Sequence, residues 1–423
     1  MISEQLLQFI WQFQYYERVS LQTTTGEALQ IISAGSHNTN QGPDFINAKI
    51  RIGHTLWAGS VELHVKASDW DRHKHQQDAN YRNVILHVVY ENDMTDNNIP
   101  VLVLEGRISG RLLGRYEQWM RNRAFIPCED SIGKVPDLTL TLWKERLIVE
   151  RLIRKAEVVK EYAAQTNYHW EEVFWWMLAR SFGMKVNADA FEAIARSISV
   201  NTLAKHKHNL VQIESLLLGQ AGMLNGTFED AYPQMLQKEY LFLQKKYALP
   251  HVHQPVHFLR MRPGNFPSLR LAQLAALVQR SSHLFSKILE ASDVQQVCQL
   301  LDVTANDFWH YHYRLDDSSV YREKRLGKTA IANICINAVV PVLFAYGSYK
   351  GQEAIKDKAI SWLQQLDAEQ NHITKGFASL GIKSASAWDS QSLLELKTQY
   401  CDLRKCLHCA VGNKILKESD VDG

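Results

Sequence analysis

Acidic and basic side chains gather on two neighbouring predicted strands near the N-terminus. Asp44 follows Pro43 at the start of one strand, and Glu62, His64 and Lys66 occupy alternate positions of the next. Residues i and i+2 of a strand share a face, and Asp44 could meet Glu62 across an antiparallel pair. Converging carboxylates bind Mg²⁺ or Mn²⁺, and a nearby lysine or histidine can orient the attacking water. The pattern indicates metal-dependent hydrolysis of phosphodiester bonds.

The same side chains also fit a plain strand face in contact with water. In that alternative Asp44 caps a turn after the proline. Glu62, His64 and Lys66 are then solvated and bind nothing. The order of the surrounding elements favours a functional site, and both interpretations stay open at the level of the sequence.

A histidine-rich loop follows the second strand. His73 and His75, with Asp78 after them, could bind a transition metal through imidazole nitrogens. The loop would lie near the acidic residues and could contact a substrate. A polar loop that binds no metal is the alternative, which we prefer from the sequence. His87 lies within an apolar strand and is expected to be a hydrogen-bonded core histidine.

Three cysteines near the C-terminus form a second candidate metal site. Cys401, Cys406 and Cys409 lie close together in the sequence, and either His408 or the distant Cys128 could supply a fourth ligand. Thiolates favour Zn²⁺ or an iron–sulfur cluster. The alternative is a set of reduced cysteines that only pack between helices.

Composition sets limits on the class of protein. The chain has 423 residues, a formal charge of +2 and six cysteines. It contains no apolar run long enough to suggest a membrane span and no recognisable signal peptide, so we expect a cytoplasmic protein with reduced or metal-bound cysteines. Cys298 and Cys335 lie in apolar helical segments and are expected to be core residues. Binding of nucleic acid would require a local basic groove, because the net charge is small.

Periodicity predicts two regions. The N-terminal region should contain a helix, three strands, a short helix and then further strands, and the rest of the chain should be helical from about Leu138. Pro127 and Pro136 interrupt the pattern, so we place the boundary within Ile126–Asp137 and expect domains at 1–130 and 131–423. The expected elements of the first domain are a helix at 3–17, strands at 28–33, 46–52, 59–66, 84–90 and 101–104, and a helix at 76–81.

These N-terminal motifs resemble the PD-(D/E)XK nuclease superfamily, whose core has this order of elements. The proline–aspartate motif would be Pro43-Asp44. The acid-x-lysine motif would be Glu62-x-His64, which has histidine in place of lysine, and Lys66 comes two residues later. The resemblance implies that Asp44 and Glu62 bind Mg²⁺ or Mn²⁺, and that His64 or Lys66 acts on the attacking water. It covers about the first quarter of the chain.

The RecB-like branch of that superfamily adds two further similarities. Gln77-x-x-x-Tyr81 matches its motif on the following helix, which implies contacts to substrate from Gln77 and Tyr81, with His73 and His75 nearby. Some RecB-like nucleases also hold an iron–sulfur cluster with one remote and three C-terminal cysteines. Cys128 and the three C-terminal cysteines resemble this arrangement of one remote and three C-terminal ligands. Here, however, the remote cysteine follows the nuclease-like region instead of preceding it.

Across nearly its full length the chain also resembles a bacterial domain-of-unknown-function family. The similarity rests on Gly42-Pro43-Asp44-Phe45, Arg262-Pro263-Gly264-Asn265-Phe266-Pro267 and Cys406-Leu407-x-Cys409. We therefore expect an α+β protein, with an N-terminal nuclease-like mixed sheet flanked by helices and a larger all-α domain. The expected function is nucleic-acid hydrolysis. The alternative is a nuclease-like protein that binds nucleic acid or a protein partner without cleaving.

Overall fold

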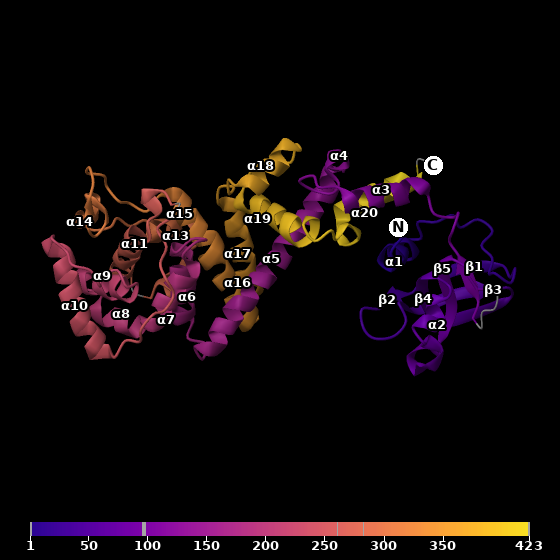
Figure 1. Cartoon of the computed structure of the whole chain (residues 1–423), viewed down its shortest axis with the longest axis horizontal. Coiled ribbons are helices and arrows are strands. Elements are labelled where there is room, and N and C mark those ends of the chain that lie inside the picture. Colours follow the sequence, from indigo (N-terminus) through magenta and orange to yellow (C-terminus); the bar gives the residue numbers. More distant parts are fainter. Residues whose placement is uncertain (1, 95–98, 260, 282, 422–423) are drawn as a thin grey trace. The chain divides into compact units, whose positions relative to one another are not determined.

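The computed structural model describes residues 2–94, 99–259, 261–281 and 283–421, which form two compact units (Figure 1). Unit 1 comprises Met1–Trp143, Ser379–Ile382 and Leu396–Gly423, and unit 2 comprises Lys144–Ala378 and Lys383–Glu395. Unit 1 contains a mixed sheet and unit 2 is mainly helical, so the expected α+β class is confirmed.

The division between the units differs from the boundary that we placed at 130. It falls after Trp143, within the long helix α5 (Asp137–Gln165), because no proline or glycine interrupts that helix. The C-terminal segment also belongs to unit 1. Its return depends on long-range contacts, such as the 2.8 Å hydrogen bond from the Tyr15 hydroxyl to Asn413 Oδ1, which local periodicity cannot reveal.

The sheet of unit 1 has the strand order β1-β3-β4-β5-β6, with the short β2 also paired to β3. Neighbours are antiparallel from β1 to β4 and parallel from β4 to β6. The helix α1 precedes it, and Ser3 caps this helix by accepting a hydrogen bond from the Leu6 amide. The bounds are α1 (Glu4–Phe13), β1 (Leu29–Ser33), β2 (Ser36–His37), β3 (Phe45–Ile52), β4 (Thr55–Lys66), β5 (Val84–Glu91) and β6 (Val101–Val103).

The strands follow from the sequence pattern. In β3 the buried residues alternate along much of the strand, and Gly53 and His54 form the turn into β4. From Val61 to His64 both faces of β4 are buried, and most of β5 is buried as well. Glu62 and His64 are only 5% and 1% exposed. The alternative of a solvated strand face is therefore wrong for these two residues.

The expected helix at 76–81 is replaced by shorter turns. Lys74 adopts a left-handed conformation, and the Asp78 side chain caps the following 3₁₀ turn at Asn80, so no continuous helix forms. The remaining elements of unit 1 are α2 (Asp69–Arg72), η1 (His75–Gln77), η2 (Ala79–Tyr81), α3 (Gly110–Arg121), α4 (Glu129–Ile132), the π-helical η5 (Leu396–Cys401), η6 (Cys406–His408) and α20 (Ala410–Val421).

Unit 2 is built around one large apolar core, to which α6, α9, α11 and α16 contribute heavily. It also contains a small hairpin of β7 and β8. Its elements are α6 (Trp170–Phe182), α7 (Ala188–Ser197), α8 (Val200–His206), α9 (Leu210–Gln220), α10 (Ala231–Tyr247), η3 (Pro263–Asn265), α11 (Pro267–Arg280), α12 (Leu284–Glu290), α13 (Val294–Leu301), α14 (Asp307–His310), β7 (His312–Arg314), β8 (Asp317–Ser318), α15 (Lys328–Ile334), η4 (Cys335–Val339), α16 (Val340–Lys350), α17 (Glu353–Gln365), α18 (His372–Ser379) and α19 (Ala387–Glu395).

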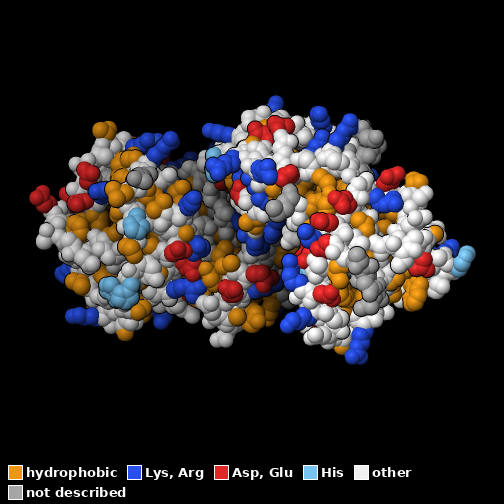
Figure 2. Space-filling model, turned by 45° about the vertical axis from the view of Figure 1, so that its right-hand side comes forward, with side chains coloured by type: hydrophobic (Ala, Val, Ile, Leu, Met, Phe, Trp, Pro, Cys, Tyr) orange, Lys and Arg blue, Asp and Glu red, His pale blue; other side chains and the backbone are white. Residues whose placement is uncertain are grey.

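From the sequence we expected no run long enough to span a membrane, but within the described residues one continuous helical stretch, Lys328–Lys350, has the length and apolar composition of a membrane span. Of its most apolar window, 72% is buried inside the protein, as expected for a core helix. The face of the molecule in Figure 2 shows basic and acidic side chains interspersed, in agreement with the small net charge.

Candidate functional site

The two carboxylates that the sequence singled out lie next to each other. Phe45 of β3 pairs with Val61 of β4, which places Asp44 beside Glu62. The Asp44 amide donates to Glu62 Oε2 at 3.0 Å, and the Leu63 amide donates to Asp44 Oδ2 at 3.1 Å. Backbone donors therefore hold both side chains in place.

Burial makes this pair of carboxylates unfavourable in the absence of a positive charge. Burial raises the pKa of Glu62, and the charge of Asp44 raises it further. Burial likewise raises the pKa of Asp44, although the Leu63 amide and the Gln8 side chain oppose the shift. A divalent cation would offset the repulsion between the two carboxylates. The donor set therefore fits a cation.

Histidines surround the other side of Glu62. Glu62 Oε1 lies 3.6 Å from His64 Nε2 and 3.4 Å from His75 Nε2. His64 Nε2 is also 3.2 Å from His73 Nδ1, and His64 Nδ1 is hydrogen-bonded at 2.9 Å to His87 Nε2. His87 is thus a hydrogen-bonded core histidine, as expected, and it also supports the site.

Burial holds three of these imidazoles neutral. Burial lowers the pKa of His64 and His75, and it lowers the pKa of His87 to about 4. Neutral imidazole is the form that binds metals. The Trp70 ring packs beside His75 and His87, with centroid distances of 5.3 and 5.2 Å, and shields this side of the cluster.

The other residues predicted for the site are placed differently. Tyr81 stacks on His75 with ring centroids 3.8 Å apart, and burial raises its pKa to about 12. Gln77 is exposed on η1. The Lys66 side chain is 50% exposed and its Nζ lies 3.6 Å from Glu91 Oε2. Lys66 therefore pairs outside the cluster, and the structure brings imidazoles, not a lysine, to the carboxylates.

The four cysteines predicted to bind metal also come together within unit 1. Cys128 lies at the start of α4, Cys401 ends the π-helical η5, and Cys406 and Cys409 flank η6. All four are buried, and the pKa of the Cys401 thiol is raised by burial and by the negative charges of the other three thiolates. His408 is exposed, so Cys128 is the better fourth ligand.

Local structure brings the C-terminal cysteines close to α20. A Cβ at Gly412 would lie 2.3 Å from the carbonyl oxygen of Cys406, so only glycine allows this approach. Cys298 and Cys335 lie in unit 2, and each shifts the pKa of the other thiol; Cys335 is a core residue as expected, and Cys298 is partly buried against the core.

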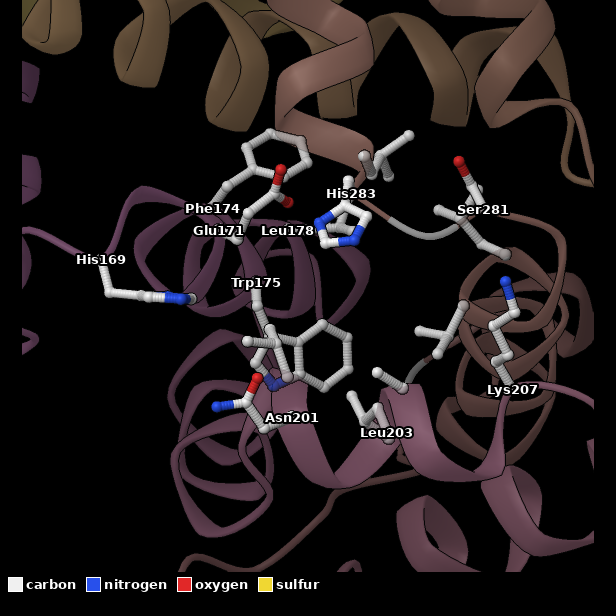
Figure 3. A pocket seen from close by; sticks show the side chains of 15 residues that line it. His169, Glu171, Phe174, Trp175, Leu178, Asn201, Leu203, Lys207, Ser281 and His283 are labelled. Atoms are coloured by element: carbon white, nitrogen blue, oxygen red, sulfur yellow. The ribbon is translucent and has the colours of Figure 1, made fainter.

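Unit 2 contains a mainly apolar pocket that the sequence did not suggest. Figure 3 shows Trp175, Leu178 and His283 around it, with Glu171 at its edge. The Glu171 carboxylate accepts hydrogen bonds from the amides of Phe285 and Ser286 at 3.1 and 2.9 Å. It therefore caps α12 and has a structural role.

Comparisons with known proteins give one positive result. No curated protein matches the chain, and no solved structure does. A family described as "Protein of unknown function (DUF2851)" matches residues 4–372, which include the carboxylates, the histidines and Cys128 but not the three C-terminal cysteines. Because this match covers most of the 423 residues, the chain belongs to the DUF2851 family.

Proposed function

We propose that the protein is a metal-dependent hydrolase that cleaves phosphodiester bonds in DNA or RNA. The observation that carries this proposal is the adjacent carboxylates of the partly buried Asp44 and the buried Glu62, fixed by the backbone amides of Asp44 and Leu63. A helix, antiparallel strands and two parallel strands in this order surround the pair, as in the PD-(D/E)XK nucleases that the motifs resemble.

The side chains have separable roles in this proposal. Asp44 and Glu62 hold a divalent cation such as Mg²⁺ or Mn²⁺, which would polarise a phosphate and lower the pKa of a bound water. His64 takes the position of the missing lysine, because it is the buried neighbour of Glu62 whereas Lys66 pairs with Glu91. Tyr81 and the partly exposed His75 lie where they could contact a substrate.

Cleavage of defined oligonucleotides tests this proposal. The full chain, stripped of metal, is incubated with labelled single-stranded, double-stranded and branched DNA and RNA, with Mg²⁺, Mn²⁺ or Zn²⁺ added back. We expect metal-dependent cleavage that is lost in Asp44→Asn and Glu62→Gln. Glu91→Gln is the matched control, because Glu91 is a half-exposed carboxylate on the neighbouring strand. Wild-type protein that cleaves none of these substrates would refute the proposal.

The position of Lys66 favours a second candidate function. Nuclease sites of this kind use a lysine near the carboxylates, and here the lysine is turned towards Glu91. The protein would then be a nuclease-like module that binds nucleic acid, or a protein partner, without cleaving it. Retention of a labelled oligonucleotide by wild-type protein that does not cleave it would support this function.

We also propose that Cys128, Cys401, Cys406 and Cys409 bind a metal centre that stabilises unit 1. Four thiolates are the ligand set of a structural Zn²⁺ site or of an iron–sulfur cluster. Free cysteines in all six positions are compatible with the proposed cytoplasmic location.

A further inference from the structure

The donor atoms around Glu62 have the spacing of a single metal site. In a tetrahedral site with metal–nitrogen bonds of 2.0–2.1 Å, neighbouring ligand atoms lie about 3.4 Å apart. The measured separations are 3.2 Å between His64 Nε2 and His73 Nδ1, 3.6 Å between Glu62 Oε1 and His64 Nε2, and 3.4 Å between Glu62 Oε1 and His75 Nε2. The nitrogens of the three histidines all lie within 4.8 Å of one another.

Hydrogen bonding alone does not account for this cluster. His75 Nε2 is buried and has no hydrogen-bond partner among the described residues, although Glu62 Oε1 is 3.4 Å away. A buried polar atom without a partner costs about 1–3 kcal/mol. The separations of 3.4 and 3.6 Å from Glu62 are long for hydrogen bonds, but they are normal between two ligands of one ion.

The local backbone is arranged to aim two histidines at the strand. Lys74 adopts a positive φ of 58° between His73 and His75, a conformation that costs energy for a residue with a side chain. The preceding turn is anchored by Asp69, which accepts a hydrogen bond from the Lys66 amide at 3.3 Å and lies 2.8 Å from Arg72. This strained turn brings both imidazoles to Glu62 and His64.

The surroundings match those of a catalytic metal site. His87 holds His64 through its other ring nitrogen, which is the usual arrangement around a metal-bound histidine. His64 is buried, His75 is partly buried and His73 is exposed, so the site is open to solvent on the His73 side. Asp44 lies beside Glu62 and is left available as a second carboxylate.

We propose that His64, His73, His75 and Glu62 form a transition-metal centre of the zinc type. Three imidazoles and one carboxylate select Zn²⁺ or a similar ion over Mg²⁺, which prefers oxygen ligands alone. The proposal deepens the hydrolase proposed above: at the same site Zn²⁺ takes the place of Mg²⁺ or Mn²⁺, and His64 is a ligand of the metal and no longer the substitute for the missing lysine. The geometry of this metal site does not depend on which substrate, if any, is hydrolysed.

Metal binding tests the proposal without any assay of hydrolysis. Metal-free full-length protein is titrated with Co²⁺, a coloured substitute for Zn²⁺, and then competed with Zn²⁺. The histidine site should give visible cobalt bands without the near-ultraviolet sulfur-to-cobalt band that a cysteine site produces. We expect one equivalent of this sulfur-free species in the wild type.

Surface variants keep the test independent of folding. His73→Gln changes an exposed residue and should abolish the sulfur-free species, whereas His54→Gln, at an exposed histidine in the β3–β4 turn, should leave it unchanged. His87→Gln should weaken Co²⁺ binding about 10- to 100-fold without removing it. The proposal would be overturned if the wild type formed no sulfur-free cobalt species. It would also be overturned if this species persisted in both His73→Gln and His75→Gln. Cobalt binding without cleavage of any oligonucleotide would refute only the proposed hydrolase.

Discussion

A buried glutamate in unit 2 should make the protein less stable as the pH rises. Glu214 on α9 is fully buried and accepts hydrogen bonds from Trp309 Nε1 at 3.1 Å, the Tyr232 hydroxyl at 2.9 Å and Asn306 Nδ2 at 2.8 Å. Despite these donors, burial raises its pKa from 4.5 to about 7. The folded protein therefore keeps a proton that the unfolded chain releases.

The sign and size of the effect follow from this difference in pKa. Between pH 4.5 and 7 the unfolded chain binds fewer protons at Glu214 than the folded protein does, so the free energy of unfolding falls as the pH rises. The contribution is fully present below pH 4.5 and is lost above pH 7. A pKa difference of this size corresponds to on the order of 3 kcal/mol.

The substitution Glu214→Gln removes the titrating group and keeps one acceptor oxygen, which can serve Trp309 and Tyr232, the two donors to Glu214 Oε2. The amide nitrogen then faces Asn306, which donates to Glu214 Oε1 in the wild type. We expect the variant to be similar to the wild type at pH 5 and more stable at pH 8. Its stability relative to the wild type should grow by about 2–3 kcal/mol between these values, slightly less than the full effect, because part of the wild-type loss has already occurred at pH 5. Urea unfolding curves, followed by tryptophan fluorescence at both pH values, measure this difference.

A second buried glutamate provides the control. Glu395 of α19 is paired with Arg151 and Arg154 at 3.1 and 2.5 Å, so Glu395→Gln should destabilise the protein at both pH values by leaving these arginines without their partner. A Glu214→Gln variant that is less stable than the wild type at pH 8, or one whose relative stability is the same at pH 5 and pH 8, would refute the reasoning.

Three further predictions concern unit 1. Asp44→Asn and Glu62→Gln should each lower kcat/KM for oligonucleotide cleavage by about 100-fold or more, because each removes a ligand charge. Lys66→Ala should change kcat/KM only a few-fold, since Lys66 is exposed and paired with Glu91; equal losses in all three variants would contradict the assigned roles. Cys128→Ser and Cys406→Ser should lower the iron or zinc content and the melting temperature of anaerobically purified protein, measured by elemental analysis and calorimetry. The control Cys298→Ser should leave the metal content unchanged, and wild-type protein without iron or zinc would exclude the cysteine metal centre. Gly59→Ala should destabilise the protein by about 1–3 kcal/mol in chemical denaturation, because a Cβ there would lie 2.5 Å from Ile85 Cγ2 and 2.6 Å from the Asn83 carbonyl oxygen. Gly114→Ala has open space around it and should be neutral or stabilising; equal changes in the free energy of unfolding for the two variants would contradict the packing argument.

Local patterns in the sequence were enough to predict the strands and the acidic pair. Alternating apolar residues fix which face of β3 is buried, and a two-residue turn at Gly53 fixes the hairpin to β4. The register of that turn alone would place Phe45 opposite Glu62. An irregularity between Phe45 and Ala48, where Asn47 has a φ of 60°, shifts the register by one residue, so that Phe45 pairs with Val61 and Asp44 lies beside Glu62. The sequence also placed Glu62 and His64 on one face, because side chains alternate along a strand.

Tertiary structure alone decided which residues join that pair. His73 and His75 reach Glu62 only through the left-handed turn at Lys74, a conformation that the sequence does not dictate for a lysine. His87 was assigned to the core, and the parallel pairing of β4 with β5 also puts it next to His64. Lys66 shares the strand but pairs with Glu91, because the far end of β4 is exposed.

The same distinction applies to the cysteines. Their spacing in the sequence predicted that Cys401, Cys406 and Cys409 would lie near one another, since all three fall within one short segment. It left the fourth ligand open between His408 and Cys128. The return of the C-terminal segment to unit 1 brings these three cysteines to Cys128. Such a return is determined by contacts between residues hundreds of positions apart, such as Tyr15 and Asn413, and these contacts leave no periodic trace in the sequence.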